Sequence, residues 1–265
     1  FAHLETIYLG ILARRTKIAT NVRNVVEAAG GATVLYFPAR FDHWAVQGGD
    51  GYAAHIGGAG GVSTDAQAEW WGAKGSGTVP HALIAATGGD TVCAVRMFGE
   101  SYPDTNLVAL VDFDNDCIGT ALRCCREIGP ALWGVRLDTS ENMVDKSILP
   151  TMGCFKPTGV VPELVFMMRD ALDREGFQKV KIIVSGGFNP ERIAMFKKLG
   201  VPMDAYGVGS CLMQGQFDYT ADVVLVNGKH CAKEGRRFRP NPRLEQVNHQ
   251  EARDEKGAGS GRHSE

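Results

Sequence analysis

The chain opens with a stretch whose apolar positions recur with the spacing of a helix. Its first apolar residues lie at i, i+3, i+4, i+7 and i+8, on one helix face: Leu4, Ile7, Tyr8, Ile11 and Leu12. A second stretch repeats this pattern from Ile18 to Ala29 and stops at Gly30-Gly31, which is typical of a helix C-terminus. Residues 1–30 are therefore predicted to form a helical lead-in. Because neither a methionine nor an N-cap residue precedes Leu4, we expect a longer parent chain.

Beyond residue 31, short apolar runs alternate with amphipathic stretches. The apolar, β-branched runs predict five buried parallel strands, at 33–37, 107–113, 132–137, 181–184 and 205–208. The amphipathic stretches predict helices at 65–74, 81–97, 118–128, 162–175 and 191–199. This alternation indicates right-handed βαβ units in an α/β protein. An open doubly wound sheet would fit the pattern too, but the number of units favours a parallel barrel.

The C-terminal part of the chain loses this pattern. Residues 221–226, followed by Asn227-Gly228, predict a β-hairpin. We assign residues 31–240 to one barrel domain that ends with this hairpin. After Pro240 the chain becomes polar and rich in glycine, a composition that cannot bury enough apolar surface to fold. Residues 241–265 are therefore predicted to form a disordered tail.

Composition and charge exclude several classes of protein. The 28 Lys and Arg residues nearly balance the 30 Asp and Glu residues, giving a net charge of −2, so no charge excess points to nucleic acid or an anionic membrane. No apolar run approaches the roughly 18 residues of a membrane span, and the first residues lack the features of a signal peptide. The seven cysteines include no CxxC pair and no zinc-ligand spacing, which favours buried thiols. We therefore expect a cytoplasmic protein.

Polar residues and glycines follow the predicted strands one after another. Ligands of parallel α/β folds bind at the carboxyl ends of the strands, so the residues that follow each apolar run are candidates for a site. Five predicted strands and the two short runs 60–62 and 75–80 end at an ionisable side chain, a hydroxyl or a glycine loop: Arg40, Ser63, His81, Asp112, Asp138, Ser185-Gly186-Gly187 and Gly207-Val208-Gly209-Ser210. The sequence thus predicts one site at this edge of the sheet.

The two glycine loops suggest a phosphate ligand. Backbone N–H groups of residues 185–187, next to a helix expected after Pro190, suit a phosphate, and residues 207–210 have the same character on the next strand. A single Ser-Gly-Gly is more often a tight turn. Two such loops on adjacent strands favour a phosphate site.

The remaining candidates are two carboxylates and a histidine. An aspartate at a strand end is usually an N-cap, and we expect Asp114 or Asp116 to cap the following helix. Facing a phosphate pocket, Asp112 and Asp138 could bind ribose hydroxyls, hold Mg²⁺ or stabilise positive charge on a sugar ring. His81 follows the extended lead-in Gly-Thr-Val-Pro, which fixes the direction of its imidazole.

At these positions the sequence resembles a known family. The motifs GTVPHALI (77–84), VDFDND (111–116), GVRLDT (134–139) and VSGGF (184–188) are similar to those of nicotinate phosphoribosyltransferase, in the nicotinate/quinolinate phosphoribosyltransferase superfamily. The resemblance covers residues 1–245 and lacks the family's N-terminal third. It implies an irregular parallel α/β barrel of the type II phosphoribosyltransferases, with remnants of a second, β-rich domain.

The resemblance also implies an activity. The family condenses nicotinate with 5-phosphoribosyl 1-pyrophosphate to give nicotinate mononucleotide and pyrophosphate, a step of NAD biosynthesis. ATP hydrolysis is coupled to this step through a phosphorylated histidine, which makes ATP a co-substrate and Mg²⁺ a cofactor. A homodimer with a shared active site is implied as well.

Site residues follow from the resemblance position by position. His81 corresponds to the phosphorylated histidine, and Asp112 and Asp138 correspond to carboxylates at the ribose and its magnesium ion, with Asp138 as the metal ligand. Arg136 is implied to contact the ribose or its phosphate, and Arg40 the carboxylate of nicotinate, which a guanidinium matches. The implied 5′-phosphate ligands are Ser185, Gly186, Gly187, Gly209 and Ser210.

Ser63 bears on the choice of substrate. It stands where the nicotinamide-using relatives place an aspartate that accepts a hydrogen bond from the amide. A neutral serine favours the acid, because an aspartate would repel a carboxylate. Asp65 lies two residues further on, and a shift in register would reverse this inference.

Two other functions stay open from the sequence. Quinolinate phosphoribosyltransferase has the same barrel without the ATP step, but it needs a cluster of basic residues for two carboxylates, and only Arg40 and Arg136 stand near the right strand ends. A non-catalytic module that binds phosphoribosyl ligands without turnover is the second alternative.

Overall fold

The computed structural model describes residues 2–153 and 155–243 of the chain. Its contacts divide the chain into two units: residues 14–217, and a smaller unit that includes residues 2–13 and 218–243. The expected division into 1–30, 31–240 and 241–265 stays a prediction, and residues 244–265 of the expected tail lie outside the described residues.

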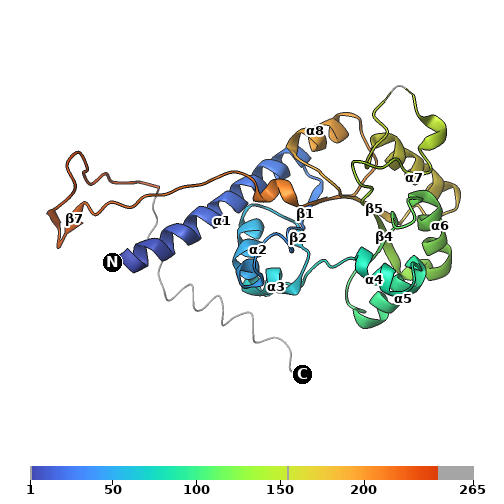
Figure 1. The fold of residues 1–265 in the computed structure, drawn as a ribbon, viewed down its shortest axis with the longest axis horizontal. Coiled ribbons are helices and arrows are strands. Elements are labelled where there is room, and N and C mark those ends of the chain that lie inside the picture. The colour runs from blue at the N-terminus through green and yellow to red at the C-terminus, as the bar shows by residue number, and fades with distance from the viewer. Residues whose placement is uncertain (1, 154, 244–265) are drawn as a thin grey trace. The chain divides into compact units, whose positions relative to one another are not determined.

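The larger unit is built on one parallel sheet of six strands, which curls among its helices (Figure 1). The spatial order is β2-β1-β6-β5-β4-β3, with every neighbouring pair parallel. The strands are β1 (Thr33–Tyr36), β2 (Gly61–Val62), β3 (Leu107–Leu110), β4 (Leu132–Leu137), β5 (Lys181–Val184) and β6 (Ala205–Val208). The five predicted strands are confirmed, although β1 and β3 end before the expected boundaries, and β2 is a short addition.

A segment without regular structure bridges the two edge strands. The Ser76 N–H donates to the carbonyl oxygen of Val62 on β2 at 2.6 Å, and the Val79 N–H approaches that of Val108 on β3 at 3.5 Å. Residues 75–80 thus occupy the place where a seventh strand would close a barrel. Two glycines and a proline in this segment weaken regular pairing. The predicted irregular α/β barrel is confirmed, and this segment is its irregular part.

The strands bury apolar side chains on both faces. On β5, Ile182 and Val184 belong to the large core that the helices cover, whereas Ile183 belongs to a small cluster with Val108 and Ala205. This alternation is expected for a parallel sheet with both faces covered. The small cluster lines a cavity of about 500 Å³ together with residues near the amino ends of the strands.

The helices follow the predicted pattern on the second half of the chain. The structure has α6 (Cys117–Ile128), α7 (Pro162–Arg174) and α8 (Pro190–Lys198), each within one residue of the expected boundaries. Asp116 caps α6 by accepting from the Gly119 N–H, as one of the two expected caps. The two N-terminal amphipathic stretches form one continuous helix, α1 (Ala2–Ala29).

Two predicted helices were wrong in extent because glycines interrupt them. The stretch 81–97 divides into α4 (His81–Ala86) and α5 (Thr91–Ser101), separated by Gly88 and Gly89, which both have positive φ. The stretch 65–74 contains only α3 (Asp65–Ala68) and a 3₁₀ turn over 69–71, which Gly72 ends at a φ of 71°. In both places the apolar residues keep their helical spacing beyond a glycine that ends the helix, so the spacing alone predicted a helix that was too long.

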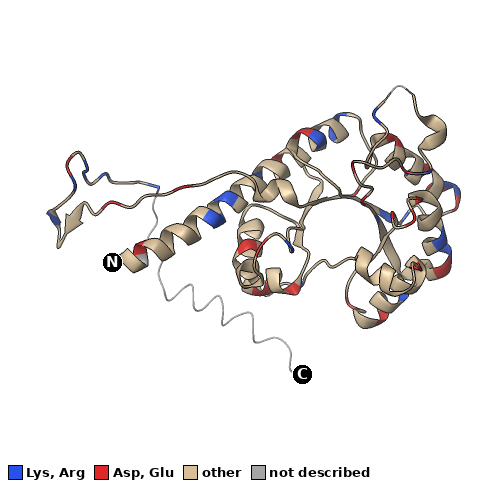
Figure 2. Ribbon diagram, in the orientation of Figure 1, with Lys and Arg blue, Asp and Glu red and all other residues tan. Residues whose placement is uncertain are grey.

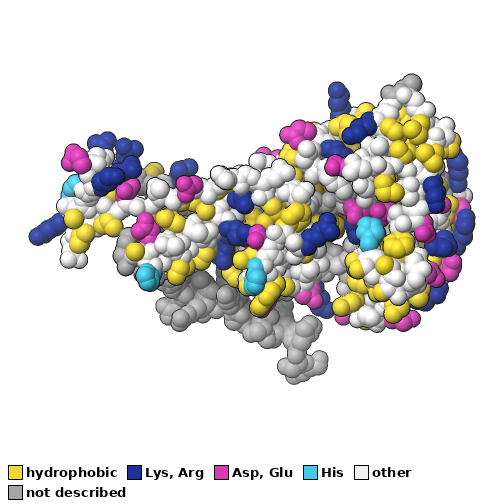
Figure 3. Space-filling view, in the orientation of Figure 1, with side chains coloured by type: hydrophobic (Ala, Val, Ile, Leu, Met, Phe, Trp, Pro, Cys, Tyr) yellow, Lys and Arg dark blue, Asp and Glu magenta, His cyan; other side chains and the backbone are white. Residues whose placement is uncertain are grey.

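One helix, α2 (Gln47–Ile56), was not predicted. Its sequence, QGGDGYAAHI, contains three glycines, which lowers its helix propensity. A Cβ at Gly51 would overlap the backbone carbonyl of Gln67, so this glycine lets α2 pack closely on α3. Exposed apolar side chains, including Ile56 and Trp70, gather over this region (Figure 3).

The smaller unit contains the predicted hairpin in a shorter form. Strands β7 (Leu225–Val226) and β8 (Lys229–His230) pair antiparallel around Asn227 and Gly228. Both turn residues have positive φ, as a type I′ turn requires.

Acidic and basic residues are interspersed over the helices (Figure 2). No helix in the described part of the chain is long and apolar enough to cross a membrane.

Candidate active site

A cavity of about 1090 Å³ lies at the carboxyl ends of the strands. Its wall includes nearly all the residues that the sequence singled out: Arg40, Ser63, His81, Arg136, Asp138, Ser185, Gly186, Gly187, Gly209 and Ser210. Asp112 does not line the cavity, but its carboxylate contacts His81. The structure thus brings these residues together around one opening, and their individual roles stay predictions.

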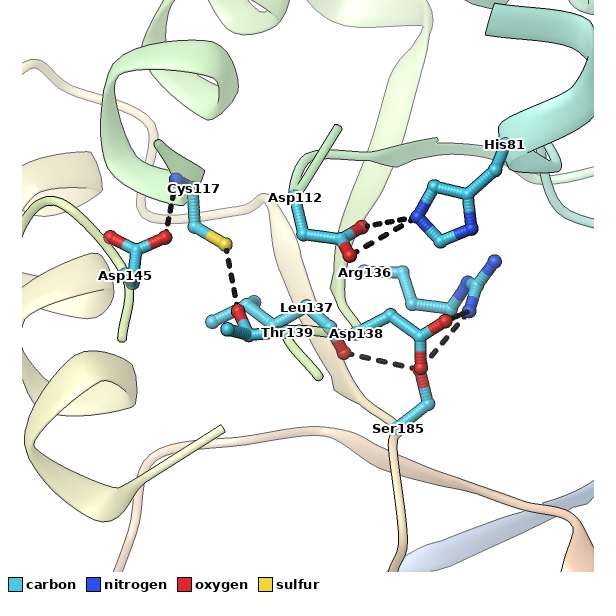
Figure 4. A network of polar contacts seen from close by, with 9 residues as sticks. All are labelled: His81, Asp112, Cys117, Arg136, Leu137, Asp138, Thr139, Asp145 and Ser185. Carbon is cyan, nitrogen blue, oxygen red and sulfur yellow. Dashed lines mark hydrogen bonds and ion pairs between the residues drawn. The ribbon is translucent and has the colours of Figure 1, made fainter. Parts of the chain in front are cut away.

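His81 and Asp112 form a pair at the cavity wall (Figure 4). The Nε2 atom of His81 lies 3.0 Å and 3.1 Å from the two carboxylate oxygens of Asp112. The carboxylate is largely buried, with 10% of its side chain exposed, whereas the imidazole is half exposed. The hydrogen bond to Asp112 raises the pKa of His81 above its ordinary value of 6.5, although partial burial opposes the shift. The pair therefore favours a protonated imidazole.

Asp138 lies in a second network, which comes from strands β4 and β5 (Figure 4). Its Oδ1 accepts from the Ser185 hydroxyl at 2.7 Å, and its Oδ2 lies 3.1 Å from Nη1 of Arg136. Nη1 also donates to the Ser185 hydroxyl oxygen at 3.1 Å. Alternate residues of β4 point to the same face, so Arg136 and Asp138 are brought together by the strand itself. The network fixes the direction of the Asp138 carboxylate at the cavity wall.

Arg136 is a buried cation with spare donor capacity. Only 8% of the residue is exposed, and its Nε has no hydrogen-bond partner among the described residues. The guanidinium lies 5.7 Å from the centre of the Phe37 ring. An unsatisfied buried donor costs about 1–3 kcal/mol, which an acceptor atom on an anionic ligand would recover.

The glycine loops leave backbone donors without acceptors. Gly186 and Gly187 have φ values of 87° and 70°, in the region that favours glycine. Within the described residues, the N–H groups of Gly186, Gly187 and Gly209 donate to no acceptor. A Cβ at Gly207 would overlap the Phe37 ring, so glycine is required there for packing. These N–H groups at the cavity wall suit an anion.

The Ser63 hydroxyl is held by buried amides. The N–H and the hydroxyl of Ser63 both donate to Oε1 of Gln67, at 3.1 Å and 2.9 Å, and Nε2 of Gln67 donates to Oε1 of Gln47. Asp65 does not contact these amides. Its Oδ1 accepts a hydrogen bond from the Gly75 N–H at 2.8 Å and thereby holds the start of the bridging segment. Both Ser63 and Asp65 line the cavity.

Arg40 is an exposed cation of the site. It forms no ion pair or hydrogen bond within the part of the chain that the structure describes. Its loop is held by Arg14 on α1, which binds the buried Asp50 through two hydrogen bonds of 2.7 Å and Asp42 at 2.8 Å. The sequence analysis missed Arg14, because its partners lie far along the chain.

Lys74 is a further cation at the cavity wall that the sequence analysis missed. It precedes the bridging segment and lies 3.5 Å from Asp104, with both side chains exposed. Such an exposed pair contributes little to stability. The ammonium group therefore stays available to an anionic ligand.

A buried bridge joins the loops that follow β3 and β4. The Asp145 carboxylate, which is fully buried, accepts from the Cys117 N–H and the Ser147 N–H, each at 2.9 Å. The thiol of Cys117 lies 3.5 Å from the Thr139 hydroxyl (Figure 4), and burial raises its pKa well above the ordinary value. The bridge fixes the loops that carry Asp112 and Asp138.

No cluster of three or more metal-binding side chains exists among the described residues. Mg²⁺ commonly binds through one or two carboxylates and the phosphates of its substrate. The Asp138 carboxylate at the cavity wall fits this requirement, since within the described part of the chain each of its oxygens accepts one interaction.

The chain is similar to curated nicotinate phosphoribosyltransferases. It is 31% identical over 229 residues to the enzyme pncB1 of Mycobacterium tuberculosis, covering 83% of this chain and 46% of the relative. The enzyme of Bacillus subtilis is 27% identical over 219 residues, covering 79% of this chain and 40% of the relative. No family model matches the chain.

Solved structures show the same fold. The nicotinate-nucleotide pyrophosphorylase of Pyrococcus furiosus superposes with a TM-score of 0.69 and is 36% identical, covering 87% of this chain and 55% of that structure. Human nicotinic acid phosphoribosyltransferase superposes with a TM-score of 0.56 and is 15% identical, covering 78% of this chain and 49% of that structure.

Fold and similarity together define a type II phosphoribosyltransferase. Within this class the chain belongs to the nicotinate phosphoribosyltransferase family, which confirms the resemblance seen in the sequence. The chain spans about half the length of the curated relatives that it matches.

Proposed function

We propose that this site transfers the phosphoribosyl group of 5-phosphoribosyl 1-pyrophosphate to nicotinate, giving nicotinate mononucleotide and pyrophosphate. One observation carries the proposal: backbone donors for a phosphate, a carboxylate for a ribose and a free guanidinium for a carboxylate line one cavity. The relatives named nicotinate phosphoribosyltransferase support it.

Each ligand group has a partner in the cavity. The 5′-phosphate accepts hydrogen bonds from the N–H groups of Gly186, Gly187 and Gly209, and from the Ser210 hydroxyl. The ribose lies beside Asp138 and Arg136. Arg40 binds the carboxylate of nicotinate, because a guanidinium presents two parallel donors to the two oxygens.

The reaction exchanges one bond for another at C1 of the ribose. The bond from C1 to the pyrophosphate oxygen breaks, and a bond from C1 to the pyridine nitrogen forms. Positive charge develops on the ring as the first bond lengthens, and the fixed carboxylate of Asp138 stabilises that charge. The leaving pyrophosphate carries its negative charge away, and Lys74 and the protonated His81 are the cations that can neutralise it.

ATP is proposed as a co-substrate that phosphorylates His81. Asp112 holds the Nε2–H, so Nδ1, after it has given its proton to solvent, is the ring nitrogen left to attack the γ-phosphorus, with ADP as the leaving group. Water later cleaves the phosphoimidazole and releases phosphate. Mg²⁺ is proposed as a cofactor at Asp138, where it would neutralise charge on the pyrophosphate of the donor. The homodimer with a shared site and the cytoplasmic location stay predictions.

Quinolinate is the competing substrate, since the same class of barrel uses it. It carries two carboxylates and needs two free cationic groups close together. In the cavity, Arg136 is already paired with Asp138, and Lys74 is assigned to the pyrophosphate of the donor, which leaves Arg40 as the unpaired guanidinium of the described wall. This inventory favours a ligand with one carboxylate.

The test is product formation from nicotinate, nicotinamide and quinolinate, each with the phosphoribosyl donor and with or without ATP. We expect nicotinate mononucleotide from nicotinate, at a higher rate with ATP. Formation of the same product from quinolinate with release of carbon dioxide would contradict the proposed substrate. Saturable donor binding without any product would support the non-catalytic alternative.

A further inference from the structure

Arg192, in the first turn of α8, holds the first glycine loop from behind. Its Nη1 donates to the carbonyl oxygen of Gly186, and its Nη2 donates to that of Val160, each at 2.6 Å. The guanidinium stacks 4.3 Å from the centre of the Phe188 ring. The sequence analysis did not single out this residue, because its partners are backbone carbonyls.

The contact with Gly186 determines where the next N–H points. The peptide that joins Gly186 and Gly187 is trans, so its C=O and N–H point in opposite directions. Arg192 binds the C=O and is not part of the cavity wall, whereas Gly186 and Gly187 are. The Gly187 N–H is therefore directed away from Arg192 and toward the cavity.

Arg192 also places a positive charge behind this loop. Burial lowers its pKa, and the field of Glu141 partly offsets that shift. No carboxylate pairs with Arg192 within 4.0 Å in the described part of the chain. A charge that is not cancelled by an ion pair attracts an anion on the other side of the loop more strongly.

We propose that Arg192 is a positioning residue for phosphate: it orients the Gly187 N–H into the cavity and adds, behind the loop, a positive charge that is not engaged in an ion pair within the described residues. The inference rests on the proposed phosphate-binding function of the loop. It adds a determinant of affinity for the phosphoribosyl group that does not touch the ligand.

Arg169 on α7 provides a matched control. Its Nη1 and Nη2 donate to the carbonyls of Val180 and Phe177, at 2.9 Å and 3.0 Å, and neither acceptor lines the cavity. Arg169→Met and Arg192→Met each remove two hydrogen bonds to backbone carbonyls. Arg169→Met also removes an i,i+4 ion pair with Asp173, so its structural cost is at least as large, and the acceptors of Arg169 lie away from the phosphate loop.

The experiment titrates the ¹⁵N-labelled 265-residue chain with ribose 5-phosphate and follows the Gly187 amide by NMR. In the wild type, we expect a saturable downfield shift of that amide. Arg192→Met should raise the dissociation constant about tenfold and reduce the Gly187 shift, as loss of one charge-assisted contact would. Arg169→Met should leave both unchanged.

Two results separate this inference from the function on which it rests. Wild-type binding together with an unchanged dissociation constant and Gly187 shift in Arg192→Met would overturn the role of Arg192 alone. No saturable binding by the wild type would overturn the phosphate loop itself. If Arg192→Met does not fold by circular dichroism, Arg192→Gln, which removes the charge and keeps an amide donor, replaces it. A wild-type dissociation constant together with an unchanged Gly187 shift in that variant overturns the inference.

Discussion

Nε2 of His81 lies 3.0 Å from Oδ1 of Asp112, across the gap between the bridging segment and the end of β3. The carboxylate occupies one ring nitrogen and stabilises the protonated ring. Nδ1 of the same ring makes no hydrogen bond among the described residues. Nε2 of His81 is therefore bound to the carboxylate, whereas Nδ1 is free to react or to bind a ligand.

The first prediction concerns pH. Because the pKa of His81 is raised in the fold, the pair stabilises the protein below the ordinary pKa of 6.5, and this contribution is lost as pH rises through the folded pKa. Asp112→Asn should lower the pKa of His81, as measured by NMR titration of its imidazole. Asp114→Asn, at an exposed neighbour, should leave it unchanged. Equal His81 pKa values in the wild type and Asp112→Asn would contradict the pairing.

The second prediction concerns ATP. His81→Ala should abolish the ATP-dependent gain in rate while leaving slow phosphoribosyl transfer, because the carboxylates and phosphate contacts act directly on the breaking bond. In the wild type, ³¹P NMR should place the phosphoryl group on Nδ1. His55→Ala on α2 is the control and should keep the gain. An equal stimulation by ATP in His81→Ala would exclude the phosphohistidine.

The third prediction concerns the charge of Asp138. Asp138→Asn keeps the size and the acceptor for Ser185 but loses the negative charge. We expect kcat and kcat/KM to fall together, by about 10²–10³, because the charge acts mainly in the transition state. Asp104→Asn, at the cavity edge, should change both little. An unchanged kcat with a raised donor KM that excess Mg²⁺ restores would reduce Asp138 to a metal ligand.

The fourth prediction concerns the loop that carries Arg40. Asp42→Asn removes one ion pair of Arg14 and keeps the buried pair with Asp50. The loop should become less ordered, so the KM for nicotinate should rise about threefold to tenfold while the donor KM stays the same. Asp170→Asn, in an exposed pair on α7, serves as the control. A parallel rise of both KM values would point to a general loss of structure.

The fifth prediction concerns packing beneath the phosphate loops. Gly207→Ala would place a methyl group against the Phe37 ring and 3.1 Å from Cβ of Ser185. We expect a loss of about 1–3 kcal/mol in the free energy of unfolding, measured by urea denaturation. Gly10→Ala in α1, where no atom lies within 4 Å of the added carbon, should not destabilise. Equal stabilities would show that the Phe37 ring moves freely.

The fold could be predicted where the signal is local. Strands β4, β5 and β6 have the predicted boundaries. Strands that are buried on both faces of a parallel sheet consist of continuous apolar, β-branched residues, so the ends of such a run in the sequence mark the ends of the strand. Helix α2 escaped prediction because its glycines serve close packing on α3, which no local pattern reveals. The bridging segment 75–80 escaped for a related reason, since its hydrogen bonds join it to strands far away in the chain.

The candidate site shows the same division. Side chains that stand directly at strand ends, such as Asp138 and Ser185, were predicted because every strand of a parallel sheet ends at the same edge. Arg14 and Arg192 were not, because each acts from a helix on a loop that contributes to the cavity wall. Residues that position a site carry no motif of their own.

The most direct test of the site is a crystal structure of the chain with nicotinate mononucleotide. We predict the phosphate within hydrogen-bond distance of the Gly187 and Gly209 N–H groups, the ribose beside Asp138 and the carboxylate on Arg40. Density for the nucleotide away from these groups, for example in the adjoining cavity of about 500 Å³ lined by Trp133 and Lys181, would contradict the assignment.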